Sequence, residues 1–432
     1  MTPSLRPCRP LHYGLVIMAA GVLFNLSSHG FGRFAYAVIL PPMRDGLGLD
    51  YTQTGLLATA NFTGYVVFSL LGGTIASRVG LRRLEVLGLA LVGSSMLFTG
   101  LAGSFMAAAA GRTLTGLGSA IANVATLGLA TAWFAPSRRG LAVGVIVGGS
   151  GLGISLSGVL VPMVVSSYGN EGWRYAWFCL SAIVLMVAGL AFLIARDRPS
   201  LMGLLPLGAE AKNKKDGNDE NRETHERNER MKSRPEWRVA YTSPVLWRCG
   251  LAYFAFGLAY VVAGTFFVAY LQAEVGMTEV EAGSLWSTAG FISIFSPALF
   301  GAVSDSIGRS RGLAASFAIM GTSLTIFAST RSAPGAILAT ALFGLSVWPI
   351  PALIAALTGD LAGPRLAPAG LGFVTVLFGI GQAIGPGLGG YVADQTGSFA
   401  PALAASALIA FAAAAFSLTL PSRTSSVSLV AE

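Results

Sequence analysis

The sequence predicts an all-α membrane protein in which twelve transmembrane helices form two pseudo-symmetric halves of six. Three observations carry this prediction. The 432 residues are 53% hydrophobic and only 11% charged, which is too little charge to cover the surface of a soluble protein. Apolar runs long enough to cross a bilayer recur along the chain, and a backbone inside lipid must form its hydrogen bonds within a helix. The third observation is an internal repeat.

The predicted spans follow one another roughly every 35 residues, about the length of one span and a short loop. A basic lead containing Arg6 and Arg9 precedes the first span, which is too long for the h-region of a cleaved signal and is therefore expected to remain. The spans are predicted at residues 12–42, 52–76, 84–104, 106–134, 140–168, 173–195, 245–273, 281–304, 311–330, 335–358, 366–393 and 399–420.

Arginine and lysine residues indicate the orientation of the chain. One side of the predicted membrane receives the central polar stretch and the clusters around Arg83 and Arg311, whereas the other side keeps only Arg44, Arg174 and Arg331. Because basic loops stay in the cytoplasm, both termini are predicted to be cytoplasmic. We expect a multi-pass protein of a bacterial inner membrane.

Composition divides the chain into three parts. Residues 196–243 are predicted to form a solvated cytoplasmic linker, because the run AKNKKDGNDENRETHERNERMKSR within them carries mixed charge and almost no apolar side chains. The linker separates an N-terminal six-helix half, residues 1–195, from a C-terminal half, residues 244–432. A tether between the halves is the favoured interpretation of this linker, because it contains no recognisable binding module.

The two halves repeat at an offset of 228 residues. Gly48 matches Gly276, Arg83 matches Arg311, and the register holds without a gap across roughly a hundred residues. A parallel repeat of two six-helix halves is typical of transporters, in which the binding site lies between the halves near the membrane midplane.

The loop after the second span, GTIASRVGLRR, and its counterpart GAVSDSIGRSR carry a recognisable motif. Both resemble the G-x-x-x-D-x-x-G-R motif of the major facilitator superfamily, and the repeat and span count extend this resemblance over nearly the whole chain. The resemblance implies that these loops hold the cytoplasmic gate. Ser77 replaces the acid in the first copy, so a strong ion pair is expected only in the second. The implied gate residues are Gly73, Arg78, Gly80, Arg82, Arg83, Gly301, Asp305, Gly308, Arg309 and Arg311.

Two further segments resemble motifs of the same superfamily. RTLTGLGSA, which begins at Arg112, resembles the R-x-x-x-G-x-G motif of the fourth span. We expect Arg112 to extend to the nearby outer interface, and a gating or coupling role is the alternative that the resemblance implies. GQAIGPGLGG, which begins at Gly381, resembles the glycine-proline motif of antiporters but lies in the opposite half. It is interpreted as a packing element.

The stretch from Asn25 to Pro42 places a cation inside an apolar span. Asn25, His29, Arg33 and Tyr36 would share one face of an α-helix. An arginine at the centre of a span costs about 2.5–3.5 kcal/mol on insertion scales, so its face must meet protein or a wet cavity. No carboxylate lies in the middle of a predicted span, which leaves Arg33 available to an anionic substrate. A structural bond to backbone carbonyls is the alternative.

Polar and aromatic side chains of the first, second, fourth, seventh, tenth and eleventh spans are predicted to complete a central site. His29 either takes up a proton during transport or stays neutral and forms a hydrogen bond. The predicted substrate-binding residues are Arg33, His29, Tyr36, Asn61, Tyr65, Asn123, Tyr260, Trp348 and Gln382.

The segment HGFGRFAYAVILPPM narrows the substrate class. It resembles YbfB/YjiJ-type bacterial members of the superfamily and their relatives among monocarboxylate and oxalate/formate carriers. That resemblance implies a small organic anion and proton symport. The predicted function is therefore secondary transport by rocking of the two halves. Efflux of a hydrophobic or cationic compound, or a transporter-like solute sensor, are the alternatives.

Patterns of soluble enzymes are missing from the sequence. It contains no Walker sequence and no G-x-S-x-G, and its three histidines lack metal-ligand spacing. The three cysteines lie far apart and suggest no disulfide framework. We expect no enzymatic activity, cofactor or metal, a monomer in the lipid bilayer, and no nucleic-acid partner, because topology explains the net charge of +8.

Overall fold

The computed structural model describes residues 12–209 and 241–421, with only the backbone at 70–78 and 364–365. Within these ranges the chain is helical and has no β-strand, apart from one isolated bridge between Phe134 and Leu207. The first bundle consists of α1 (Tyr13–Asn25), the π-helix η1 (Leu26–Phe34), α2 (Tyr36–Leu47), α3 (Tyr51–Val79), α4 (Leu81–Leu101), α5 (Phe105–Trp133), α6 (Pro136–Tyr168) and α7 (Gly172–Ile194).

The second bundle begins after the 3-10 helix η3 (Pro199–Met202) and the undescribed residues 210–240. One long helix of this bundle contains a break at Gly363, where φ is 70°, so that it provides parts of two successive spans. Its helices are α10 (Pro244–Ala273), α11 (Glu279–Ile307), α12 (Arg309–Ser329), α13 (Ala333–Ser346), α14 (Pro349–Thr396) and α15 (Ala400–Leu418).

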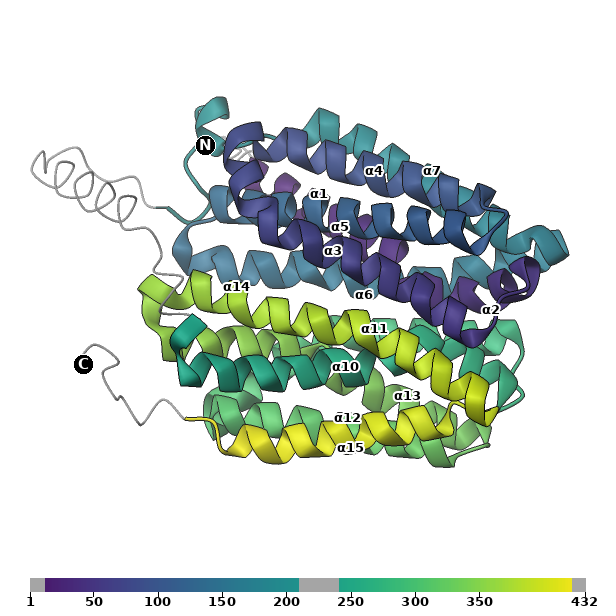
Figure 1. Cartoon of the computed structure of the whole chain (residues 1–432). Coiled ribbons are helices and arrows are strands. Elements are labelled where there is room, and N and C mark those ends of the chain that lie inside the picture. The colour runs from purple at the N-terminus through teal and green to yellow at the C-terminus, as the bar shows by residue number, and fades with distance from the viewer. Residues whose placement is uncertain (1–11, 210–240, 422–432) are drawn as a thin grey trace, which may run out of the picture.

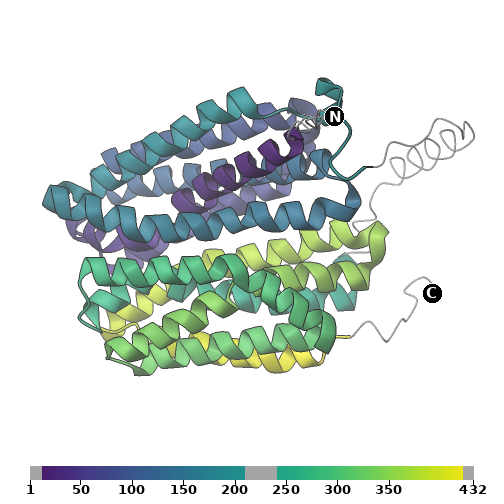
Figure 2. The same ribbon diagram turned by 180° about the vertical axis from the view of Figure 1, so that it is seen from behind.

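The two bundles lie side by side, with the purple-to-teal helices in one and the green-to-yellow helices in the other (Figures 1 and 2). The described chain ends near His12 and Pro421 lie at the same end of the molecule (Figure 1). We call this the terminal end, and the opposite end, which includes Gly48 and Gly276, the distal end.

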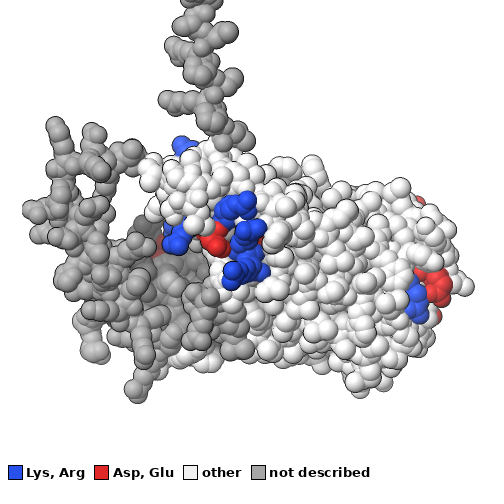
Figure 3. Space-filling model, turned by 90° about the horizontal axis from the view of Figure 1, so that it is seen from above, with Lys and Arg blue, Asp and Glu red and all other residues white. Residues whose placement is uncertain are grey.

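The distribution of charge fits a protein that crosses a bilayer. Figure 3 shows charged side chains near the two ends of one face and a broad band without them between the ends. Ten candidate spans occur among the described residues, one of which, Pro136–Ile194, contains both α6 and α7. The multi-pass all-α fold is thus confirmed, whereas the exact count of twelve spans stays a prediction.

Glycines bring the bundles together along two seams, α3 against α14 and α6 against α11. A side-chain carbon added to Gly390 would overlap the backbone of Tyr51, and one added to Gly158 would overlap the backbone of Gly283. Nearer the terminal end, by contrast, a carbon added to Gly144 of α6 would meet nothing within 4 Å. The bundles are therefore in backbone contact over the distal half of these seams.

The beginning of the predicted linker is bound to the first bundle. The Leu207 N–H donates to the carbonyl of Trp133 at 2.8 Å, and the Ala135 N–H donates to the carbonyl of Leu207 at 3.1 Å. This contact attaches the chain after α7 to the α5–α6 turn. The rest of the predicted linker, residues 210–240, lies outside the described residues.

Candidate functional site

The segment that carries Arg33 is a π-helix. Residues 26–34 adopt this wider turn, and the Ala35 N–H donates to the carbonyl of Gly30, five residues earlier, at 2.9 Å. The absence of side chains at Gly30 and Gly32 permits close packing, because a carbon added at Gly30 would overlap the backbone of Gly153 on α6. The expected regular α-helix is wrong here. π-helical turns inside α-helices occur frequently at functional sites.

Two of the four polar residues that were expected to share one face with each other bond to other helices of the first bundle. Asn25 accepts a hydrogen bond from Ser150 on α6. Tyr36 donates through its hydroxyl to the carbonyl of Thr54 at 2.8 Å. Both side chains therefore bond to neighbouring helices, whereas Arg33 approaches the second bundle.

Arg33 is a buried cation, with 7% of its surface exposed. Its Nη2 donates to Oε1 of Gln382 at 2.7 Å, and its guanidinium carbon lies 4.4 Å from the ring centre of Phe62 and 4.7 Å from that of Tyr65. Over residues 12–209 and 241–421 no carboxylate forms an ion pair with Arg33, and its Nε has no hydrogen-bond partner. Donor capacity therefore remains for an anion.

Gln382 connects the cation to the second bundle. Its side-chain NH2 donates to the hydroxyl of Tyr260, so its amide oxygen is the atom that faces Arg33. The Tyr260 ring stacks on Phe256 with a centroid distance of 4.5 Å, and its centroid lies 6.2 Å from that of Trp348. The predicted residues Arg33, Gln382, Tyr260 and Trp348 are thus brought together across the two bundles.

A second polar chain borders the same cation within the first bundle. The His29 ring packs edge-on against Tyr65 with a centroid distance of 5.7 Å, and its Nδ1 forms a 3.2 Å hydrogen bond with Ser28. Asn123 donates to the hydroxyl of Tyr65 at 2.9 Å. His29, Tyr65 and Asn123 therefore form one connected wall beside Arg33.

A cavity adjoins this group on the side of the second bundle. The rings of Phe34 and Trp348 meet edge-on, with centroids 5.1 Å apart, at its border. Its wall is almost wholly apolar, and the space that it encloses holds no more than about one water molecule. The lining residues are Phe34, Ile154, Tyr260, Gly264, Trp286, Ala289, Gly290, Phe343, Val347 and Trp348.

Arg112 lies inside the first bundle, with 1% of its surface exposed, so its predicted extension to the interface is wrong. Its Nη1 donates to the carbonyl of Gly32 at 2.9 Å, and its guanidinium carbon lies 4.6 Å from the ring centre of Tyr36. Asn61 donates to the Arg112 carbonyl at 3.1 Å. This cluster bonds to the π-helix within the first bundle. The structure places Tyr36 and Asn61 in this cluster rather than in contact with Arg33.

A fully buried carboxylate was missed in the sequence. Glu85 lies on the second turn of α4, has 0% of its surface exposed, and accepts a hydrogen bond from Thr126 of α5 at 2.8 Å. Its Oε1 has no partner among the described residues. The sequence places Glu85 near a span end beside Arg82 and Arg83, and this position gave no sign of its burial.

The second copy of the predicted gate motif forms an ion pair. Arg309 lies 2.7 Å from Asp305 and 3.8 Å from Asp360, and it also donates to the Ser304 hydroxyl at 2.6 Å. Gly308 has a φ of 98°, which explains why glycine is needed between α11 and α12. Gly301 has open space beside it, and Arg311 is exposed.

In the first copy of the gate motif, Arg82 is bonded to Asp197, a residue that lies outside the motif. The Arg82 backbone N–H donates to Asp197 at 2.7 Å, and its side chain donates to the carbonyl of Phe192 at 2.6 Å. Gly80 has a φ of 88°, and Arg83 is exposed. The predicted gate residues Gly73 and Arg78 lie where only the backbone is described, within α3.

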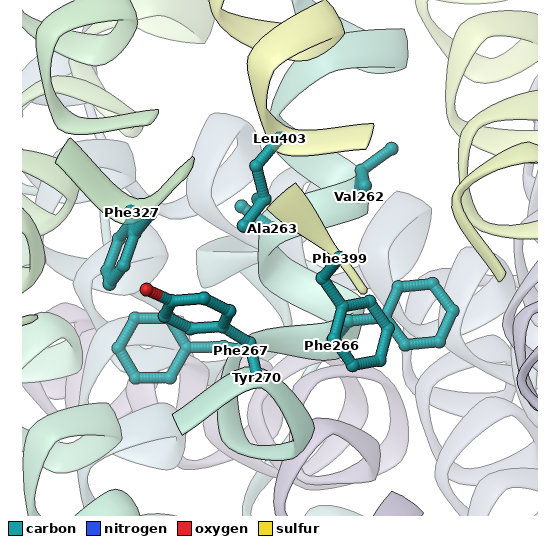
Figure 4. A pocket seen from close by; sticks show the side chains of 8 residues that line it. All are labelled: Val262, Ala263, Phe266, Phe267, Tyr270, Phe327, Phe399 and Leu403. Carbon is teal, nitrogen blue, oxygen red and sulfur yellow. The ribbon is translucent and has the colours of Figure 1, made fainter. Parts of the chain in front are cut away.

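A separate apolar cavity lies among α10, α12 and α15 (Figure 4). The Tyr270 hydroxyl is its main polar group, and it donates to the carbonyl of Thr330 at 2.8 Å. We assign this region to aromatic packing, because it offers no charged group to a solute. Its lining residues are Val262, Ala263, Phe266, Phe267, Tyr270, Phe327, Phe399 and Leu403.

Comparison with protein families gives a match over most of the chain. The family model described as "Major Facilitator Superfamily" matches residues 22–367 and 249–431. Among solved structures, a bacterial homologue of the human lysosomal transporter Spinster, in an inward-facing and occupied conformation, superposes with a TM-score of 0.73. That comparison covers 95% of this chain and 97% of the other, at 16% identity, and therefore concerns the fold alone.

Curated relatives include two bacterial transporters. A hexuronate transporter of Bacillus subtilis (strain 168) is 27% identical, over 93% of this chain and 92% of the relative. A probable sulfoacetate transporter of Cupriavidus necator is 25% identical, over 85% of this chain and 84% of the relative. A probable chloroplastic anion transporter of Arabidopsis thaliana is 28% identical over a shorter region, 39% of this chain and 33% of the relative.

Proposed function

This chain belongs to the major facilitator superfamily, and on that premise we propose that it is a secondary transporter that moves a small organic anion across the membrane. The observation that carries the proposal is Arg33. A buried guanidinium with no carboxylate partner among the described residues and an unpartnered Nε is suited to bind an anionic group of a substrate.

The geometry of arginine favours a carboxylate or a similar oxyanion. Its planar guanidinium presents several N–H donors that match two oxygens at once. The relatives named above transport hexuronate and, with probable assignment, sulfoacetate, both of which carry a carboxylate.

Alternating access is supported by the uneven contact between the bundles. The seams are closed in their distal half, where Gly158 meets Gly283, and glycines nearer the terminal end have open space beside them. Together with the basic loops at the terminal end, this geometry fits an inward-facing carrier with both termini in the cytoplasm of a bacterial inner membrane. Rocking of the bundles would expose Arg33 on the other side.

Proton symport completes the proposal, with His29 as the candidate proton acceptor. His29 lies four residues before Arg33 and packs against Tyr65 in the same wall of the site. Histidine is the side chain whose ordinary titration range is nearest to neutral pH. Replacing His29 with glutamine, which keeps hydrogen-bonding groups but cannot carry the charge, is expected to abolish acceleration of uptake by an inward proton gradient while exchange continues.

The decisive experiment is transport by the purified protein in proteoliposomes. Radiolabelled glucuronate, sulfoacetate and lactate are tested separately, with and without a pH gradient, against vesicles that lack protein. We expect uptake of at least one acid, competition by related acids, and no competition by lipophilic cations. Competition by lipophilic cations alone would contradict the proposed substrate class.

A further inference from the structure

We propose that Gln382 acts as a surrogate ligand for Arg33. Its amide oxygen binds the guanidinium when no substrate is present, so that the empty carrier can seal its central site and reorient. This inference rests on the proposed function, in which Arg33 binds the substrate anion. It assigns to Gln382 a role in the substrate-free half of the transport cycle.

The orientation of the Gln382 amide is fixed from both sides. Its oxygen accepts from Arg33 at 2.7 Å, and its NH2 donates to the hydroxyl of Tyr260. Tyr260 is itself held between rings, with stacking on Phe256 at a centroid distance of 4.5 Å. Because a guanidinium offers donors only, this arrangement presents the one group of Gln382 that can bind it.

The two partners belong to bundles that must move relative to one another. Side-chain carbons added at Gly257 and Gly381 would overlap the backbone of the facing helix, which joins α10 and α14 closely around Gln382. Gly30 makes an equally close contact with Gly153 and joins the π-helix to α6. The 2.7 Å hydrogen bond between Arg33 and Gln382 is therefore a link between the two moving bodies.

A neutral amide is a suitable ligand for this purpose. Gln382 is 1% exposed, so its oxygen supplies a buried acceptor where an unsatisfied guanidinium would be costly. A hydrogen bond between two charged groups is stronger than one to a neutral amide, so a substrate carboxylate can displace Gln382. A fixed carboxylate at the same position would instead compete with every anionic substrate.

The proposed role of Gln382 predicts that its loss affects two modes of transport differently. In exchange, each reorientation of the carrier occurs with substrate bound, and the substrate satisfies Arg33. In net uptake, the carrier must return empty, and Gln382 must satisfy Arg33. Loss of the amide should therefore slow net uptake much more than exchange.

The test compares net uptake with counterflow in proteoliposomes, with radiolabelled glucuronate and, in parallel, radiolabelled sulfoacetate as probes. Gln382→Leu is expected to lower the ratio of net uptake to counterflow roughly ten- to a hundredfold, the factor that corresponds to one lost hydrogen bond to a charged group. Tyr260→Phe, which frees the amide without removing it, should act in the same direction by a smaller factor. Gln395→Leu, an exposed glutamine on the same helix, is the matched control and should change neither mode.

Gln382→Glu provides an independent check, because it places a fixed negative charge beside Arg33. It is expected to weaken both modes by raising the substrate concentration needed for half-maximal transport. Equal loss of both modes in Gln382→Leu and Tyr260→Phe, or loss of neither, would overturn the surrogate role. Absence of transport by the wild-type protein for every acid contradicts the proposed function itself, and the inference about Gln382 then falls with it.

Discussion

The two bundles repeat in sequence, yet they use the equivalent part of their first helix differently. In the first bundle, residues 26–34 form a π-helix that carries His29 and Arg33. In the second bundle the equivalent residues, 254–262, lie within the regular α-helix α10, with Gly257 and Val261 at the corresponding positions. The cation and its unusual backbone therefore occur in one copy only.

The partner of the cation shows the same asymmetry. Gln382 on α14 corresponds by the repeat to Ile154 on α6, which lines the neighbouring apolar cavity. Each member of the pair formed by Arg33 and Gln382 thus has an apolar counterpart. The two halves share helix lengths and seams, and the candidate site lies at positions where their residue types differ.

Of the substitutions that test the difference between the bundles, replacement of Arg33 should have the largest effect. Arg33→Lys keeps the charge but loses the planar set of donors, so uptake per molecule is expected to fall about a hundredfold, the factor for one to two lost charge-assisted hydrogen bonds. The measurement is kcat/KM for uptake in proteoliposomes, normalised to protein content. Arg44→Lys, at a helix end where the side chain is 27% exposed, is the control, and normal kinetics in Arg33→Lys would assign Arg33 a structural role.

Adding one methyl group to the π-helix should destabilise the first bundle. The added carbon of Gly30→Ala would overlap the backbone of Gly153, whereas the repeat places Leu258 at the equivalent position of α10. We expect a loss of about 1–3 kcal/mol, seen as a lower melting temperature in detergent. The control Gly144→Ala has nothing within 4 Å and should melt at the wild-type temperature or slightly above it. Equal melting temperatures would show that the π-helix adapts freely.

The two seams differ at their distal ends, and this difference predicts a smaller effect. Asp394 of α14 accepts bonds from the backbone N–H groups of Tyr51 and Thr52 on α3, whereas Ser166, its counterpart on α6, bonds within its own helix. Asp394→Asn is expected to weaken the seam between α3 and α14 by about 1 kcal/mol.

That loosening can be measured by chemical labelling. A cysteine introduced at Thr59, whose hydroxyl donates to the carbonyl of Ala383 across the seam at 2.7 Å, should react several-fold faster with a membrane-impermeant maleimide in Asp394→Asn cells. Ser166→Ala in the same background should leave the labelling rate unchanged. If both variants accelerate labelling equally, the carboxylate does not distinguish the seams.

The smallest effect is expected at the gate motif, where the two copies differ in their acidic residue. Asp305 pairs with Arg309 at 2.7 Å, but 66% of the Asp305 side chain is exposed, and exposed ion pairs contribute at most about 1 kcal/mol. Asp305→Asn should therefore change the uptake rate less than about fivefold. An effect as large as that of Arg33→Lys would mean that the gate, rather than the central site, limits transport.

Much of the fold follows from the sequence because hydrophobic length and charge placement act locally. The predicted span at 106–134 differs from α5 (Phe105–Trp133) by only one residue at each end, and the span at 245–273 differs from α10 by one residue at its start. The requirement that lipid-embedded backbone be helical leaves few alternatives. The repeat likewise indicates a shared scaffold before any contact is known.

The sequence by itself determined that a cation lies within an apolar span and that no acid lies mid-span to pair with it. Only the tertiary structure decided that residues 26–34 form a π-helix, that Arg112 turns inward to Gly32, and that Glu85 is buried. The partner of Arg33 lies 349 residues away in the chain. Local patterns set helix lengths, but hydrogen bonds between helices depend on how closely glycines allow their backbones to approach.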